Sequence, residues 1–179
     1  MSKKIVVLST SLRKNSNSHA LAEAFAKGAA DAGCEVELIS LKGKRIGFCS
    51  GCLACQKTGL CMINDDAVEI ERKVLNADVV AWATPIYYYE MSGQMKALID
   101  RLNPMFPKDY AFRDVYFLAA AADNKPHVPE RAIEGLKGWI DCFEKAKFRG
   151  FVFCGGVAAP GEIKGSDKLD AAYEMGRLV

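Results

Sequence analysis

Two kinds of hydrophobic pattern alternate along the chain. Short, continuous apolar runs rich in β-branched residues are typical of strands that are buried on both faces of a parallel sheet. These runs occupy residues 4–9, 35–40, 78–83, 114–121 and 147–154. Between them lie segments whose apolar residues recur at helical spacing, so each strand is joined to the next through a right-handed helical crossover. The pattern predicts an α/β fold: a doubly wound, five-stranded parallel sheet with helices on both faces.

Helices are expected where the apolar repeats run. The repeats cover residues 21–32, 67–74, 95–102, 133–143 and 169–176. Gly33 is a natural stop for the first helix, and Pro104 ends the third. Asp66 with Glu69 resembles a capping pair that opens the second. No internal repeat or Pro/Ser-rich linker divides the chain, so residues 1–179 are expected to form one domain.

Charge and apolar run length exclude several classes of protein. The 24 Lys and Arg residues against 22 Asp and Glu residues give a net charge of +2, which offers no broad electrostatic case for binding nucleic acid or an anionic membrane. The apolar runs are far shorter than the roughly 20 residues of a membrane span. The N-terminus passes directly into a strand, without a recognisable signal peptide. We therefore expect a cytoplasmic protein with neither nucleic acid nor a membrane as its partner.

The loop after the first strand, residues 10–18, is rich in groups that bind anions. This hydroxyl loop carries three serines, two asparagines, one arginine and one lysine, and it ends at a helix N-terminus. Free backbone N–H groups and the helix dipole favour an anion at such a place. The loop has neither the GxGxxG nor the GxxxxGK[ST] pattern, and its hydroxyls suit a terminal phosphate monoester. The alternative is a solvated loop whose Ser or Asn merely caps the helix.

The segment after the third strand, residues 84–92, places three consecutive tyrosines behind a proline. Consecutive tyrosines cannot all face one core, so at least one of these rings is expected to be exposed at the end of the strand. Backbone groups of this tyrosine segment can bond the edge of a heterocycle, and a tyrosine ring can lie against its face. A packed dimer surface is the alternative, and the two interpretations are compatible.

Both segments resemble the NADPH-dependent FMN reductase branch of the flavodoxin-like flavoproteins. Thr-Ser-Leu-Arg-Lys-Asn-Ser-Asn-Ser at 10–18 is similar to the Gly-Ser-Pro-Arg-Lys-x-Ser-Asn-Thr phosphate loop of that branch. Residues 84–88 and 91–96, with the Asp-Arg pair at 100–101, are similar to its flavin-ring segment. The departures are Thr10 and Leu12, where the family usually has Gly and Pro.

The resemblance implies a sheet of order 2-1-3-4-5, one FMN per subunit, and a homodimer or homotetramer. The residues implied to hold the FMN phosphate are Ser11, Arg13, Ser16, Asn17 and Ser18. Those implied to line the isoalloxazine ring are Thr84, Pro85, Ile86, Tyr87, Tyr88 and Tyr89.

Four of the seven cysteines lie close together in a loop at residues 47–64, the cysteine loop. They are Cys49, Cys52, Cys55 and Cys61. Three cysteines at two-residue gaps can wrap one iron–sulfur cube, with a fourth closing it, whereas structural zinc usually pairs two separated knuckles. The motif resembles that of the iron–sulfur flavoproteins, which carry a [4Fe–4S] cluster beside FMN. Zinc, a redox disulfide and inert thiols remain the alternatives. The other three cysteines are assigned no role.

The predicted function is an FMN-dependent oxidoreductase that passes electrons from NAD(P)H or a reduced carrier to a small-molecule or protein acceptor. No Ser/His/Asp order, HExxH motif or working carboxylate pair is present, so hydrolysis is not supported and no catalytic side chain is expected. Three alternatives stay open: a non-enzymatic electron carrier, a cluster-free NAD(P)H:FMN or quinone reductase, and a zinc-stabilised binding module.

Overall fold

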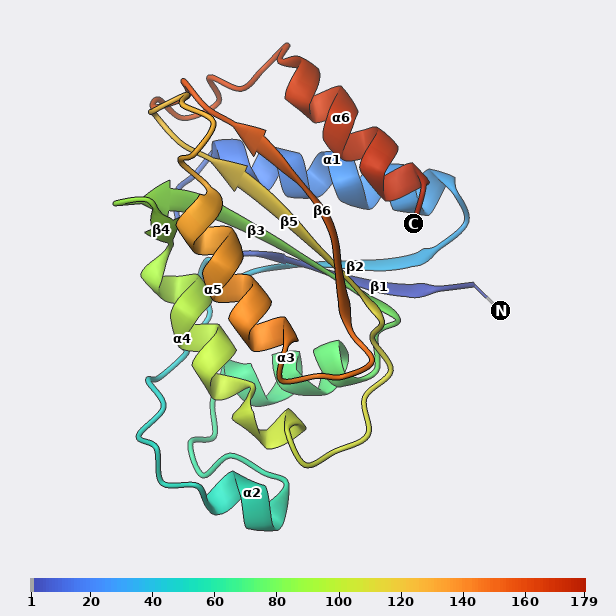
Figure 1. The fold of residues 1–179 in the computed structure, drawn as a ribbon, viewed down its shortest axis with the longest axis vertical. Coiled ribbons are helices and arrows are strands. Elements are labelled where there is room, and N and C mark those ends of the chain that lie inside the picture. Colours follow the sequence, from blue (N-terminus) through green and yellow to red (C-terminus); the bar gives the residue numbers. More distant parts are fainter. Residues whose placement is uncertain (1) are drawn as a thin grey trace.

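The computed structural model describes residues 2–179 as one central parallel sheet covered by helices on both faces (Figure 1). The five parallel strands are β1 (Lys4–Ser9), β2 (Glu35–Ser40), β3 (Val79–Tyr87), β5 (Asp114–Ala120) and β6 (Lys147–Cys154). Their order across the sheet is β2-β1-β3-β5-β6. Counting only these strands in chain order, the arrangement is the predicted 2-1-3-4-5.

The prediction of five strands misses a sixth. β3 does not stop at residue 83 but continues to Tyr87, and the two-residue strand β4 (Glu90–Met91) pairs antiparallel with its end. The tyrosine segment is therefore a β-hairpin and not a loop. Ile and Tyr have high strand propensity, which explains why the strand continues into this segment.

Helices α1 (Asn17–Asp31) and α6 (Asp167–Arg177) cover one face of the sheet (Figure 1). Helices α3 (Asp66–Leu75), α4 (Gly93–Arg101) and α5 (Glu130–Ile140) cover the other. The short helix α2 (Ala54–Thr58) lies in the cysteine loop, away from the sheet, and the 3₁₀ helix η1 (Asn103–Met105) follows α4. None of the helices in residues 2–179 combines the length and apolar character that a membrane crossing requires.

Local signals for the helix ends were only partly correct. Asp65, not Asp66, caps α3, because its carboxylate accepts the Ala67 N–H at 3.1 Å. Asp66 instead accepts the backbone N–H of Arg45 at 2.7 Å, so the predicted capping pair is wrong. Pro104 lies inside η1 rather than directly at the end of α4.

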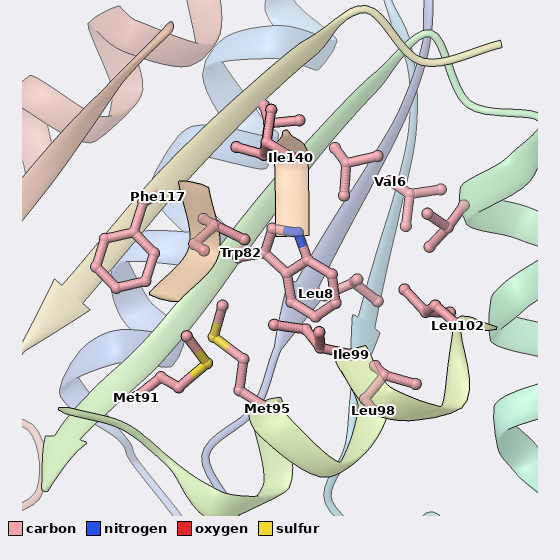
Figure 2. Packing of buried hydrophobic residues seen from close by; sticks show 14 of the residues in the cluster. Val6, Leu8, Trp82, Met91, Met95, Leu98, Ile99, Leu102, Phe117 and Ile140 are labelled. Atoms are coloured by element: carbon pink, nitrogen blue, oxygen red, sulfur yellow. The ribbon is translucent and has the colours of Figure 1, made fainter. Parts of the chain in front are cut away.

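The larger core lies between the sheet and helices α3, α4 and α5. Figure 2 shows Trp82 of β3 at its centre, near Leu8 of β1 and the α4 side chains Leu98 and Ile99. Trp82 is fully buried and meets the Trp139 ring edge-on, with 5.7 Å between the ring centroids. The apolar runs thus fill both faces of the sheet, as the sequence pattern predicts.

Helices α1 and α6 pack backbone to backbone, because glycines replace side chains where they meet. A Cβ atom on Gly28 would lie 1.9 Å from the carbonyl oxygen of Tyr173, and one on Gly176 would lie 2.1 Å from that of Phe25. Neither carbonyl can move without shifting its helix. This contact fixes α1, and with it the hydroxyl loop that precedes α1.

We expect Gly28→Ala to lower the free energy of unfolding by about 3 kcal/mol or more, the upper end of what overpacking costs. Gly138→Ala is the matched control. Gly138 lies in the last turn of α5, where an added Cβ would meet nothing within 4 Å, so alanine is expected to be neutral or to stabilise by up to about 1 kcal/mol. Urea unfolding of both variants measures the difference. Equal effects would contradict the close helix contact.

Candidate functional site

The hydroxyl loop ends at a well-formed helix N-terminus. Ser16 caps α1 by accepting the His19 N–H at 3.4 Å, and its hydroxyl lies 3.1 Å from that of Ser18. Asn15 takes the left-handed conformation at φ 53°, which turns the chain into the helix. No acidic residue lies in the first turn of α1 to neutralise the helix dipole. The loop therefore offers positive potential to an anion.

Thr10 explains one departure from the family pattern. Its side chain is fully buried, donates to the carbonyl of Ala83 at 3.0 Å and lies 3.1 Å from the Ser92 hydroxyl. Ser92 caps α4, and its N–H donates to the Thr84 hydroxyl at 3.0 Å. A threonine at position 10 thus ties the hydroxyl loop to β3 and to the start of α4.

The hydroxyl loop and the end of β3 line one cavity of about 270 Å³ at the carboxyl edge of the sheet, the cofactor pocket. Eight of the eleven residues implied to bind FMN line it. They are Ser11, Arg13, Ser16, Asn17, Ser18, Pro85, Ile86 and Tyr87. Residues 120–122 at the end of β5 and residues Val157 and Ala158 after β6 complete its walls.

The wall after β6 was missed by the sequence reasoning. The Arg13 guanidinium donates to the Ala158 carbonyl at 2.6 Å. The Asn17 side chain donates to the Ala159 carbonyl at 2.9 Å and accepts the Ile163 N–H at 3.2 Å. Because both ends of its side-chain amide bond this wall, Asn17 holds the wall in place and is not free to bind a phosphate. The two glycines that follow β6 could have indicated this wall, because glycine permits two backbones to approach closely. A Cβ on Gly155 would lie 2.4 Å from the backbone of the loop after β5.

The other three implied ring residues do not line the pocket. Thr84 is fully buried and supports Ser92. Tyr88 and Tyr89 form the two-residue turn of the hairpin, both with positive φ, and Tyr88 is 97% exposed. The Tyr89 ring stacks on His127 with 5.9 Å between the ring centroids. The tyrosine segment thus gives the pocket one apolar wall and an exposed aromatic tip.

A serine, a histidine and a glutamate lie in line beneath the hydroxyl loop. The Nδ1 atom of His19 is 2.8 Å from the Ser9 hydroxyl, and its Nε2 atom is 3.5 Å from the Glu23 carboxylate. Ser9 is fully buried at the end of β1, so its hydroxyl cannot reach a substrate. The arrangement supports the loop and does not form a nucleophile.

All four thiols of the cysteine loop line one narrow cavity, the cysteine cavity. Cys55 is buried, and its sulfur accepts the Asn103 side-chain N–H at 3.2 Å. Cys49 and Cys52 are exposed. The Ala54 N–H and then the Ser50 hydroxyl lower the pKa of Cys52 below its usual value. Two of the four sulfurs, those of Cys52 and Cys55, therefore have hydrogen-bond donors beside them.

The cysteine cavity brings the four cysteines together in a small space. Within residues 2–179, no three Cys, His, Asp or Glu side chains are grouped so that they could hold one metal ion. A cluster binds each thiolate to a different iron, so its ligands stand farther apart. At about 20 Å³ the cavity has room for about one water molecule. The four cysteines match the ligand number of one [4Fe–4S] cluster, and the cavity in this structure is smaller than such a cluster.

An anion-binding loop and an apolar wall at the carboxyl edge of a parallel sheet are the arrangement of proteins that bind a nucleotide-type cofactor there. The profile of the NADPH-dependent FMN reductase family matches residues 3–159. The chain belongs to that family, as its two cofactor segments predict.

Individual relatives share parts or all of the chain. An iron–sulfur flavoprotein of Archaeoglobus fulgidus is 38% identical over 101 residues, 56% of this chain and 46% of that protein. The chain spans about half the length of the first iron–sulfur flavoproteins that it matches. A Bacillus subtilis protein provisionally named an NAD(P)H-dependent FMN-containing oxidoreductase is 29% identical over 96% of both chains.

A solved structure confirms the fold. The NAD(P)H:quinone oxidoreductase from Methanothermobacter marburgensis superimposes with a TM-score of 0.73, covering 99% of this chain and 96% of that one. The two chains are 17% identical in sequence.

Proposed function

We propose that this protein is an FMN-dependent oxidoreductase that takes electrons from NAD(P)H or another reduced carrier. The observation that carries the proposal is the cofactor pocket, where an uncompensated helix N-terminus and three serines meet the apolar end of β3. Membership of the family and the name of the Bacillus relative support it. The acceptor is a small molecule or a protein, and the location is cytoplasmic.

The residues of the pocket divide into two groups by what they can bind. Ser11, Ser16 and Ser18 offer hydroxyls to the phosphate of FMN, and Arg13 offers charge. Pro85 and Ile86 present apolar surface to the ring. When bound there, FMN supplies the exchange between two-electron and one-electron chemistry.

The chain's own part in the reaction is to hold and shield the cofactor. Among the described residues that line the pocket, none is Asp, Glu, His or Lys. Transfer of a hydride from a nicotinamide needs no side-chain acid or base, so such a lining suffices. Consumption of NADPH and NADH by the purified, FMN-loaded protein, with a quinone or an iron complex as acceptor, tests the activity directly.

Replacing both His19 and His127 by Gln is expected to leave NAD(P)H oxidation within about tenfold of the wild type. A general acid or base typically contributes on the order of 100-fold or more, and neither histidine lines the pocket. Stopped-flow measurement of flavin reduction, normalised to bound FMN, gives the rate. A loss of a thousandfold with FMN still bound would show that one histidine is catalytic.

We further propose that the protein belongs to the iron–sulfur flavoprotein branch and that Cys49, Cys52, Cys55 and Cys61 ligate one [4Fe–4S] cluster. The shared cavity and its N–H donors support this, as do the names of several relatives. A cluster held by these four cysteines would supply single-electron transfer. Zinc, a disulfide, or a cluster-free NAD(P)H:FMN or quinone reductase are the competing outcomes.

A non-enzymatic electron carrier is the second candidate function, and one observation favours it. Four large apolar side chains on the cysteine loop are more than half exposed, as expected of a surface that meets a protein partner. They are Phe48, Leu53, Leu60 and Met62. A carrier would show negligible direct turnover of NAD(P)H. The proposed assembly is a homodimer or homotetramer, which sedimentation measures.

A further inference from the structure

One buried side chain from the end of α4 holds both ends of the cysteine loop. The side chain of Arg101 has no solvent exposure. Its Nη1 donates to the Gly47 carbonyl at 2.9 Å and to Asp65 Oδ2 at 2.7 Å. Its Nη2 donates to the Ile63 carbonyl and to Asp65 Oδ1, both at 2.9 Å. The guanidinium thus joins the first residue of the loop to residues at its end.

The third nitrogen of the same guanidinium has no partner. Within residues 2–179, Arg101 Nε is one of two buried side-chain nitrogens without a hydrogen bond, the other being Trp82 Nε1. An unsatisfied buried donor is destabilising, more so on a charged group, and such groups are rare in folded proteins. Arg101 also lines the cysteine cavity with all four thiols. The free donor therefore belongs to a residue at the wall of the proposed cluster site.

If the proposed cluster is bound, its sulfur atoms are the acceptors available to the Nε–H of Arg101. Hydrogen bonds from N–H groups to cluster sulfurs stabilise the reduced cluster and tune its potential. Asp65 neutralises the guanidinium through two bonds, so the effect of Arg101 comes from a directed N–H more than from net charge. The four Nη bonds use all the Nη hydrogens, so only the Nε–H is left to donate to a cluster sulfur.

We propose that Arg101 is the positioning residue of the cysteine loop, with its Nη groups holding the two ends closed and its Nε–H donating to a sulfur of the cluster. The inference rests on the proposed cluster. The clamp acts at the two ends of the loop, and the Asn103 side chain holds its middle at Cys55.

The test compares anaerobically purified, full-length wild type with Arg101→Lys and with the control Arg149→Lys. Lysine keeps the charge but lacks the Nε–H and the fork that spans both loop ends. Arg149 pairs with Asp114 at the surface, far along the chain from the loop. Iron retention is measured against a chelator, and the midpoint potential by a redox titration followed by electron paramagnetic resonance.

In Arg101→Lys we expect 10- to 100-fold weaker iron retention, the usual effect of removing an outer partner of a metal site. The midpoint potential should fall while FMN stays bound. Arg149→Lys should match the wild type. Should Arg101→Lys not fold, the pair Arg101→Met with Asp65→Asn removes both charges together and keeps an acceptor for the Ala67 N–H. The same losses are expected there.

Hydrogen exchange of the cluster-free proteins tests the clamp separately. Amides of residues 47–63 should exchange faster in either Arg101 variant than in wild type. Folded variants with wild-type iron retention and potential would overturn the role of Arg101 and leave the cluster proposal standing. Wild type without iron would instead refute the cluster and, with it, the sulfur donor. Unchanged exchange would then overturn the clamp as well.

Discussion

The double variant Arg13→Ala with Ser16→Ala is expected to bind FMN about 2–4 kcal/mol more weakly, roughly 30- to 1000-fold, and riboflavin with little change. Each charge-assisted bond to a phosphate is worth about 1.5–3 kcal/mol, with incomplete additivity. Both side chains line the cofactor pocket. Riboflavin lacks the phosphate, so its affinity does not depend on these bonds. Fluorescence titration of the apoprotein with each flavin measures the two affinities.

Because Ser16 also caps α1, the matched control must remove a cap and an arginine elsewhere. Arg149→Ala with Ser166→Ala does so: Ser166 caps α6 by accepting the Lys168 N–H at 3.2 Å, and neither residue lines the pocket. The control should keep wild-type affinity for FMN. Equal affinity of the wild type for FMN and riboflavin would refute the assignment of the hydroxyl loop to the phosphate.

Cys52→Ser is expected to lose the iron and sulfide of an anaerobically purified wild type that carries about four of each per chain. FMN content should not change, since the cofactor pocket contains no residue of the cysteine loop. Cys142→Ser is the control, because Cys142 is an exposed thiol outside the loop. Iron, sulfide and FMN analysis of the three proteins gives the result.

The outcome of that analysis separates the alternatives. Zinc in place of iron, lost in the same variant, would make the cysteine loop a structural metal site. Absence of iron from the anaerobic wild type would reduce the protein to a cluster-free FMN reductase.

The reason to expect a metal or a disulfide is electrostatic. Four thiolates in so small a cavity repel one another unless a metal or oxidation neutralises them.

Features that depend on neighbouring residues in the sequence could be predicted. The parallel strands follow from continuous apolar runs, and the hydroxyl loop follows from its composition and its place before a helix. The hairpin of β3 and β4 could not be predicted, because its turn residues Tyr88 and Tyr89 both have positive φ. Two-residue turns of this kind normally contain Asn or Gly, which identifies them in a sequence.

Features that depend on distant residues were invisible to pattern reasoning. Asn17 bonds the segment after β6, more than 140 positions away, so its amide looked free for a phosphate. Arg101 looked like a charged residue at a helix end, yet it is buried against Asp65, 36 positions away. In both cases the residue type was informative, and only the fold identified its partner.

The closure of the cysteine loop at its two ends has a consequence for how this fold diversifies. Arg101 of α4 bonds Gly47 and Ile63 at the two ends of the loop and Asp65 just beyond it. The four cysteines lie on the stretch between, where Asn103 bonds Cys55. Insertions, deletions or altered cysteine spacing within that stretch leave the frame intact as long as both ends meet Arg101. An extra residue in α4, by contrast, would rotate Arg101 by about 100° around the helix. The cysteine loop can therefore vary in length and cysteine spacing while the rest of the fold stays the same, and the length of α4 determines where the loop is attached.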